Sequence, residues 1–186
     1  MMAKNKGYTL VEMLIVIAII LILASLSMFS IGIIRDAKRS AAVNTFDNQI
    51  SSCLVKTKAV SDIDASGKNN ICMYVFKRDN GTKVNYCIKV GYDNTDAVKD
   101  ILSGTVLGAA YPDDSNDDGN WDAVLPKDVA DIIYEGSSIA NYQKIKFNKS
   151  NGTVTDGYGK YEFVKSDGTV YSTIYVDRLS GNHYIK

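Results

Sequence analysis

The sequence contains very little proline, histidine and cysteine. It has two prolines, one histidine and three cysteines among 186 residues. With one histidine, any Ser-His-Asp or Cys-His catalytic arrangement would depend on His183, near the end of the sequence, where a strand residue is the simpler interpretation. The sequence also has no glycine-rich phosphate loop and no His-x-x-x-His pair. It therefore predicts a protein that is not an enzyme.

The sequence has no excess of charge of either sign. Lysine and arginine together number 21, as do aspartate and glutamate, so the formal net charge is zero. A nucleic-acid-binding domain usually has a basic face, so we expect no nucleic-acid partner. Roughly 150 residues follow the apolar segment described next, which suffices for one domain with its own core.

What the sequence does have is one long apolar run near its N-terminus. Residues 8–34 are long enough to span a bilayer, for which roughly 20 apolar residues suffice. Lys4 and Lys6 precede the run and should hold that end in the cytoplasm, with the rest of the chain outside. A cleaved secretory signal and an uncleaved signal anchor would both explain these features. Neither interpretation explains Glu12, because placing a carboxylate at bilayer depth costs about 2.5–3.5 kcal/mol.

Residues 7–15 read GYTLVEMLI and resemble the class III signal of prepilins, the precursors of type IV pilins and type II secretion pseudopilins. The resemblance implies that a prepilin peptidase cleaves after Gly7 and N-methylates the new terminus at Tyr8, where the family usually has phenylalanine. It also puts Glu12 at the position of the family's acid. In a filament, the amine of Tyr8 would pair with Glu12 of a neighbour. Desolvation offsets much of that attraction, so the pair would set register more than stability.

The resemblance implies a structural function. We expect a subunit of a type IV pilus that polymerises with itself and other pilins on an assembly platform. The chain would be a single-pass membrane protein before assembly and part of an extracellular filament afterwards. A pseudopilin of a secretion or DNA-uptake machine is one alternative, and a signal-anchored extracytoplasmic binding domain is another. Phe29 stands where many pilins have a helix-kinking proline, which favours a minor subunit.

Helical periodicity continues beyond the apolar run. Val43, Phe46, Ile50 and Cys53 recur at helical spacing, and no proline or glycine interrupts residues 35–58. This amphipathic half needs a cover, and the resemblance implies an antiparallel sheet packed on it. The predicted fold is therefore α+β. Its expected parts are a cleaved leader at 1–7, a transmembrane or filament-core half-helix at 8–34, an amphipathic half-helix at 35–60 and a globular head at 61–186.

Turn residues such as asparagine, aspartate and glycine divide the head into short elements. We expect strands at 71–77, 82–91, 143–148, 159–165 and 169–177, with a terminal stub at 184–185. We expect short helices at 96–107 and 126–134.

Three cysteines, Cys53, Cys72 and Cys87, would lie on the extracytoplasmic side, where an odd number allows one disulfide and one thiol. A four-residue loop at 78–81 would put Cys72 directly opposite Cys87, and a two-residue turn at 80–81 would offset them by one pair. We expect this disulfide, with Cys53 as the alternative partner. Three buried free thiols, or a thiolate metal site completed by His183 or an aspartate, are the other interpretations.

The acidic segment 114–119 reads DSNDDG and matches the start of a calcium loop. Oxygen ligands at alternate positions converge on one hard cation, and the candidates are Asp114, Asn116 and Asp118, with Asp122 as a later ligand. The twelfth position is Leu125, where an EF-hand has glutamate. A solvated acidic turn is the alternative interpretation, and calcium is the cofactor that this segment suggests.

Three Asn-x-Ser/Thr triplets begin at Asn80, Asn148 and Asn151. Such triplets are glycosylation acceptors in exported proteins, but they also arise often in asparagine-rich turns.

Overall fold

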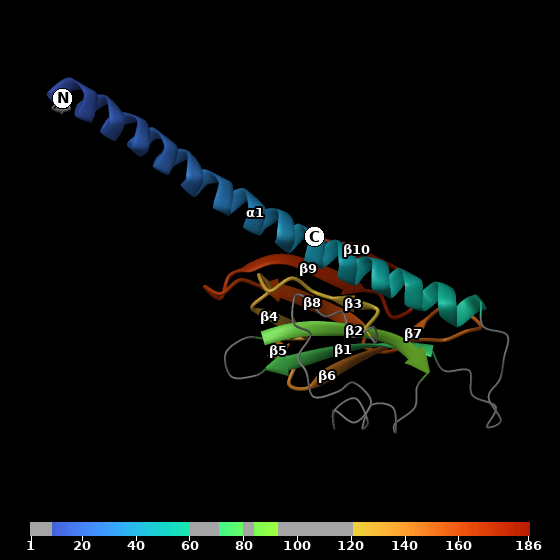
Figure 1. Ribbon diagram of the computed structural model, residues 1–186. Coiled ribbons are helices and arrows are strands. Elements are labelled where there is room, and N and C mark those ends of the chain that lie inside the picture. Colours follow the sequence, from blue (N-terminus) through green and yellow to red (C-terminus); the bar gives the residue numbers. More distant parts are fainter. Residues whose placement is uncertain (1–8, 60–70, 80–83, 93–120) are drawn as a thin grey trace. The chain divides into compact units, whose positions relative to one another are not determined.

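The computed structural model describes residues 9–59, 71–79, 84–92 and 121–186 (Figure 1). The leader, Tyr8, the predicted helix at 96–107 and the 80–81 turn lie outside these ranges. The chain divides into two compact units, Met1–Lys38 and Arg39–Lys186, so the second half of the long helix belongs with the head. The two units are described separately below.

A single helix, α1 (Leu10–Ala59), accounts for all the described residues up to 59 except Thr9. It contains no proline, and Gly32 is its only glycine. In the first unit, the large apolar side chains between Leu10 and Leu23 are exposed. Among the described residues, no helix has both the length and the apolarity that a membrane crossing requires.

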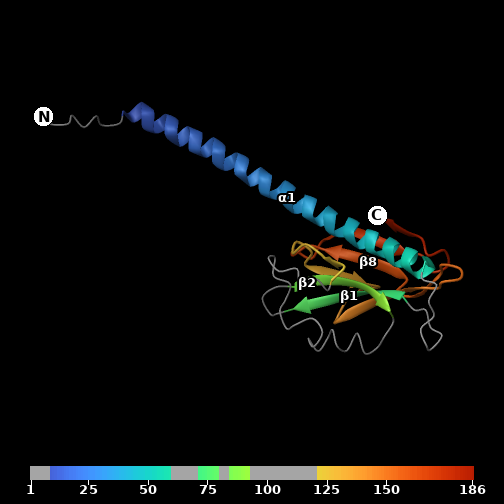
Figure 2. The same cartoon turned by 45° about the vertical axis from the view of Figure 1, so that its right-hand side comes forward.

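In the second unit, α1 buries the stripe that the sequence predicted. Val43, Phe46, Ile50 and Cys53 are all buried, while Asn44 and Asn48 between them are exposed. This part of α1 runs along the strands of the head in both views (Figure 1, Figure 2). The helical periodicity of these residues therefore does specify a packing face.

The described part of the head forms two five-stranded antiparallel sheets, which confirms the α+β class. Sheet A has the strand order β3 (Ala123–Val124), β2 (Val84–Tyr92), β1 (Ile71–Asp79), β6 (Tyr142–Phe147) and β7 (Val154–Asp156). Sheet B has the order β10 (His183–Ile185), β9 (Val170–Val176), β8 (Gly159–Val164), β4 (Asp131–Tyr134) and β5 (Ser137–Ser138).

One hydrophobic core joins the helix to both sheets. The ring of Phe46 lies 5.4 Å from that of Tyr161 and 5.3 Å from that of Phe163, both on β8. Met73 on β1 and Ile145 on β6 belong to the same buried cluster. Alternate residues of β1 and of β8 belong to this core, which is the period-two pattern of a strand with one face turned toward it.

The predicted helix at 126–134 is wrong. The amide of Val129 donates to the carbonyl of Pro126, which forms a turn, and the chain then continues as β4. Asp131–Tyr134 pairs with β8, and Ile132 is fully buried in the core. The two consecutive β-branched residues here fit a pleated surface well, and this tertiary pairing outweighs the helix-start signal of Pro126.

Candidate functional site

The first turn of α1 is closed by hydrogen bonds between Thr9 and Glu12. The amide and the Oγ1 of Thr9 each donate to Oε2 of Glu12 at 2.9 Å. The amide of Glu12 donates in return to Oγ1 of Thr9 at 3.3 Å. This is a capping box, in which a threonine before the helix and a glutamate three residues later satisfy each other's backbone amides. The Thr-x-x-Glu spacing predicts it, and our sequence analysis missed it.

The capping box gives Glu12 a role within its own chain. A negative charge in the first turn is favourable because the free amides of a helix N-terminus carry partial positive charge. Among the described residues, the hydrogen bonds to Glu12 all end on Oε2. Its Oε1 accepts no hydrogen bond from a described residue.

The described strand register overturns the geometric premise of the Cys72–Cys87 disulfide. β1 and β2 pair so that Cys72 faces Gly91 and Cys87 faces Phe76. Asp79 pairs with Val84, so the connection is four residues long and lies at 80–83, two residues later than the predicted 78–81 loop. Both expected registers were wrong because the position of the loop, more than its turn residues, decides which residues lie opposite each other.

All three cysteines are buried in this structure. Cys72 and Cys87 lie in a small cluster on the other face of sheet A, together with Trp121. Cys53 lies in the main core, where burial raises the pKa of its thiol to about 12. A thiol with such a pKa stays protonated and unreactive, so Cys53 behaves as a small apolar core residue.

Asp122 is the only candidate calcium ligand within the described residues, and it contacts cations. Its Oδ1 lies 3.7 Å from Nζ of Lys56, and its Oδ2 lies 3.6 Å from Nζ of Lys89. Oδ2 also accepts a hydrogen bond of 2.8 Å from the amide of Val90. Within the described ranges, no three His, Cys, Asp or Glu side chains form a group that could hold a metal ion. Asp114, Asn116 and Asp118 lie outside those ranges, and the calcium site stays a prediction.

His183 lies in the terminal strand β10, as the sequence suggested, and contacts α1. Its Nε2 lies 3.0 Å from Oγ of Ser51 and 3.4 Å from Oδ1 of Asp47. A Ser-His-Asp triad needs the serine and the acid on different ring nitrogens, whereas both lie here at Nε2. The arrangement therefore joins the last strand to the helix and lacks the geometry of a triad.

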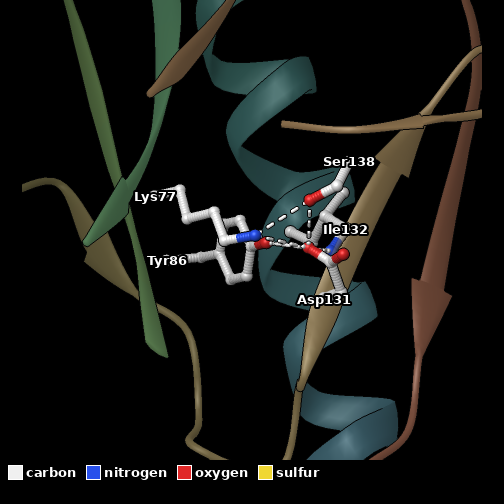
Figure 3. A network of polar contacts seen from close by, with 5 residues as sticks. All are labelled: Lys77, Tyr86, Asp131, Ile132 and Ser138. Atoms are coloured by element: carbon white, nitrogen blue, oxygen red, sulfur yellow. Dashed lines mark hydrogen bonds and ion pairs between the residues drawn. The ribbon is translucent and has the colours of Figure 1, made fainter. Parts of the chain in front are cut away.

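A polar network connects the two sheets around Asp131 on β4 (Figure 3). Oδ1 of Asp131 accepts hydrogen bonds from Nζ of Lys77 at 3.1 Å and from Oγ of Ser138 at 2.8 Å. The hydroxyl of Tyr86 on β2 donates to the same oxygen. The Tyr86 hydroxyl also accepts a hydrogen bond of 3.1 Å from the amide of Ile132. Lys77 and Tyr86 belong to sheet A, so these bonds fasten one sheet to the other.

The electrostatics of this network keep Asp131 charged and Tyr86 neutral. Burial opposes the charge of Asp131, but hydrogen bonds from Tyr86, Ser138 and Lys77 outweigh it and lower the pKa of the carboxyl. Burial, followed by the contact with Asp131, raises the pKa of Tyr86 well above its usual range. Tyr86 therefore remains a hydrogen-bond donor at any physiological pH.

Comparison with known proteins identifies the N-terminus and leaves the head without a match. The family model described as the prokaryotic N-terminal methylation motif matches residues 2–28. No curated protein and no solved structure matches the chain. The motif defines a class of protein, those made with a class III prepilin signal. The chain carries the signal of type IV pilins and pseudopilins, which implies processing by a prepilin peptidase and assembly with other pilins.

Proposed function

We propose that the chain is a structural subunit of a type IV pilus. The observation that supports this most strongly is the methylation motif at residues 2–28, which overlaps the start of α1. A prepilin peptidase would cleave after Gly7 and methylate Tyr8. The mature chain would then begin one residue before the Thr9–Glu12 capping box, with α1 whole.

The exposed apolar half of α1 supports a function in assembly. Between Leu10 and Leu23, the large apolar side chains are 47–81 % exposed. Burying one such side chain contributes about 1.5–3 kcal/mol, so water is an unfavourable environment for this segment. Lipid before assembly, and the helices of neighbouring copies after it, would both cover these side chains. We expect the chain in the membrane first and in an extracellular filament afterwards.

The charge of Glu12 would then act between copies as well as within one. After cleavage, the amine of Tyr8 in an arriving subunit would pair with Glu12 of a subunit already assembled. Two charges in an apolar filament core are costly when separated, so a misplaced subunit would leave both unpaired. The pair would therefore select the correct register along the filament.

Substitution of Glu12 tests this function. We expect Glu12→Ala to leave the chain in the membrane fraction but to reduce surface filaments strongly, counted by electron microscopy of sheared cells. Glu12→Gln is the matched control, because its amide oxygen can still accept from Thr9 while the charge is lost. We expect Glu12→Gln to reduce surface filaments as well, because the missing charge and not the missing cap causes the loss. Normal filament numbers from Glu12→Ala would overturn the proposal.

A pseudopilin is the second candidate, supported by the uninterrupted helix. α1 continues without a break from Leu10 to Ala59, through Phe29, where many pilins carry a kinking proline. A pseudopilin of a secretion or DNA-uptake machine would form short fibres, and neighbouring genes or fibre length would separate the two. A signal-anchored binding domain, the third candidate, would keep its leader.

We propose no catalytic activity for the head. The shared position of Ser51 and Asp47 at one nitrogen of His183 supports this view. Calcium remains the only proposed cofactor, at the acidic segment before Trp121.

A further inference from the structure

The β6–β7 connection, residues 148–153, contains two overlapping acceptor sequences for N-linked sugars. It reads NKSNGT, so Asn148 is followed two residues later by Ser150, and Asn151 by Thr153. Asn151 and Ser150 are exposed, and Asn148 is half-buried. A transferase can therefore reach the turn, whereas a sequence inside a strand or in the core would be inaccessible.

In both triplets the hydroxyl and the amide side chain are in contact. Oδ1 of Asn151 accepts from the amide of Thr153 at 3.1 Å and from its Oγ1 at 2.9 Å. Oδ1 of Asn148 accepts from the amide of Ser150 at 2.9 Å and from its Oγ at 2.7 Å. All of these bonds use the oxygen of the asparagine side chain. No described residue accepts a hydrogen bond from Nδ2 of Asn151, the atom that would receive the sugar.

The rest of the head fixes this turn in place. The amide of Asn148 donates to the carbonyl of Thr153 at 2.7 Å, and the amide of Gly152 donates to the carbonyl of Asn148 at 2.8 Å. Gly152 has a positive φ of 75° and is buried. Asn151 is thus held on the surface between anchored residues.

Other turns of the head show that this geometry does not require asparagine. Oδ1 of Asp167 accepts from the amide and the Oγ1 of Thr169 at 2.9 and 2.5 Å. Oδ1 of Asp177 makes a related pair of contacts with a residue three positions later, accepting from the amide and the Oγ of Ser180, both at 2.7 Å. In those turns an aspartate oxygen accepts the same kind of hydrogen bond. Turn formation alone therefore does not explain why residues 148 and 151 are both asparagine.

We propose that Asn151 is an N-glycosylation site, with Asn148 as a second acceptor in the same turn. The donor would be an oligosaccharide carried on a lipid pyrophosphate. Nδ2 forms a bond to C1 of the first sugar, the C1–oxygen bond to phosphate breaks, and the lipid pyrophosphate leaves with the electron pair. A base of the transferase takes one Nδ2 proton, so no oxidant or reductant is needed. The inference rests on the proposed function because it requires the head to lie outside the membrane.

Peptide mass mapping of the full chain purified from its own cells tests the site. We expect the peptide containing Asn151 to be heavier by whole monosaccharide units. Asn151→Asp should remove that mass, and Asn148→Asp with Asn151→Asp should leave the turn unmodified. These variants keep the Oδ1 acceptor, as Asp167 does in its own turn, so the head should fold. An unmodified native peptide, or sugar that persists in the double variant, would overturn the inference.

The same mass data separate this inference from the proposed function. A chain that has lost its leader but carries no sugar on this peptide refutes the site alone. A chain that keeps its leader but carries the sugar refutes the pilin function alone.

Discussion

Single residues at the start of α1 determine where the helix begins. Glu12 attracted attention in the sequence because it is an isolated acid in an apolar run. The structure adds that Thr9 contacts it through three hydrogen bonds. One carboxylate can therefore cap its own helix and still offer an oxygen to a neighbouring chain. The resemblance predicted Glu12 and not Thr9, although the Thr-x-x-Glu spacing was available.

Removing the Thr9 hydroxyl should loosen the first turn of α1. We expect Thr9→Val to destabilise the helix start by about 0.5–2 kcal/mol, the usual cost of losing an N-cap. Hydrogen exchange of the amides of residues 10–13, with the chain in detergent, measures this directly. Thr9→Ser keeps a hydroxyl and should protect these amides almost as well as the native residue. Equal exchange in all three proteins would contradict the capping box.

Asp131 should contribute to stability through its charge. Asp131→Asn weakens three converging hydrogen bonds, so we expect the free energy of unfolding to fall by about 1–3 kcal/mol at pH 7. The pKa of Asp131 is lowered in the folded protein. Its contribution is therefore complete above the unfolded pKa, near 4, and is lost as pH falls through the lower folded pKa. Denaturant unfolding at pH 7 and pH 3 should show the difference between native protein and variant shrinking.

The ion pair between Lys160 and Glu162 provides a control for this measurement. Nζ of Lys160 lies 2.6 Å from Oε1 of Glu162 on β8, and the lysine and glutamate side chains are 40 % and 19 % exposed. A single ion pair with one end in solvent contributes little, so Glu162→Gln should change stability by less than about 1 kcal/mol. A larger loss there than in Asp131→Asn would contradict the importance of the inter-sheet network.

At the scale of elements, hydrophobic periodicity predicted the features that depend on local sequence, namely the buried face of the helix and the positions of strands. The stripe of Val43, Phe46 and Ile50 specified the buried face of α1, and most strand positions were right to within two residues. Strand register was not predictable, because the pairing of β1 with β2 depends on how both strands pack with the rest of the head. The pairing of the strands into two sheets depends on contacts such as Phe46 with Tyr161, which no local pattern contains.

Alanine substitutions at two glycines in different turns should distinguish the cost of backbone strain from the cost of a steric collision. Gly157 has φ of 72°, and a Cβ there would collide with the carbonyl of Lys144. Gly168 has φ of 82°, and a Cβ there would meet nothing within 4 Å. We expect Gly168→Ala to cost about 1–2 kcal/mol from backbone conformation alone. Gly157→Ala should cost clearly more, measured by denaturant unfolding. Equal losses would show that the Gly157 turn can relax.

At the scale of the whole molecule, the chain combines a recognisable N-terminus with a head for which no curated protein and no solved structure gives a match. The methylation motif covers residues 2–28, and the rest of the sequence carries no comparable signature. The described part of the head nevertheless has a buried core, a polar network between its sheets at Asp131 and a strand that contacts α1 through His183. Assembly through α1 would let such a head vary in surface without altering how subunits join.

The mass of the mature N-terminus tests this account most directly. Mass spectrometry should be applied to protein purified from its own cells, from both the membrane and sheared surface fractions. We predict that the chain begins at Tyr8 and carries one methyl group on its amine, with Gly7 and everything before it removed. A chain that still begins at Met1 or Met2, or that has been cut within α1, would contradict assembly through this helix.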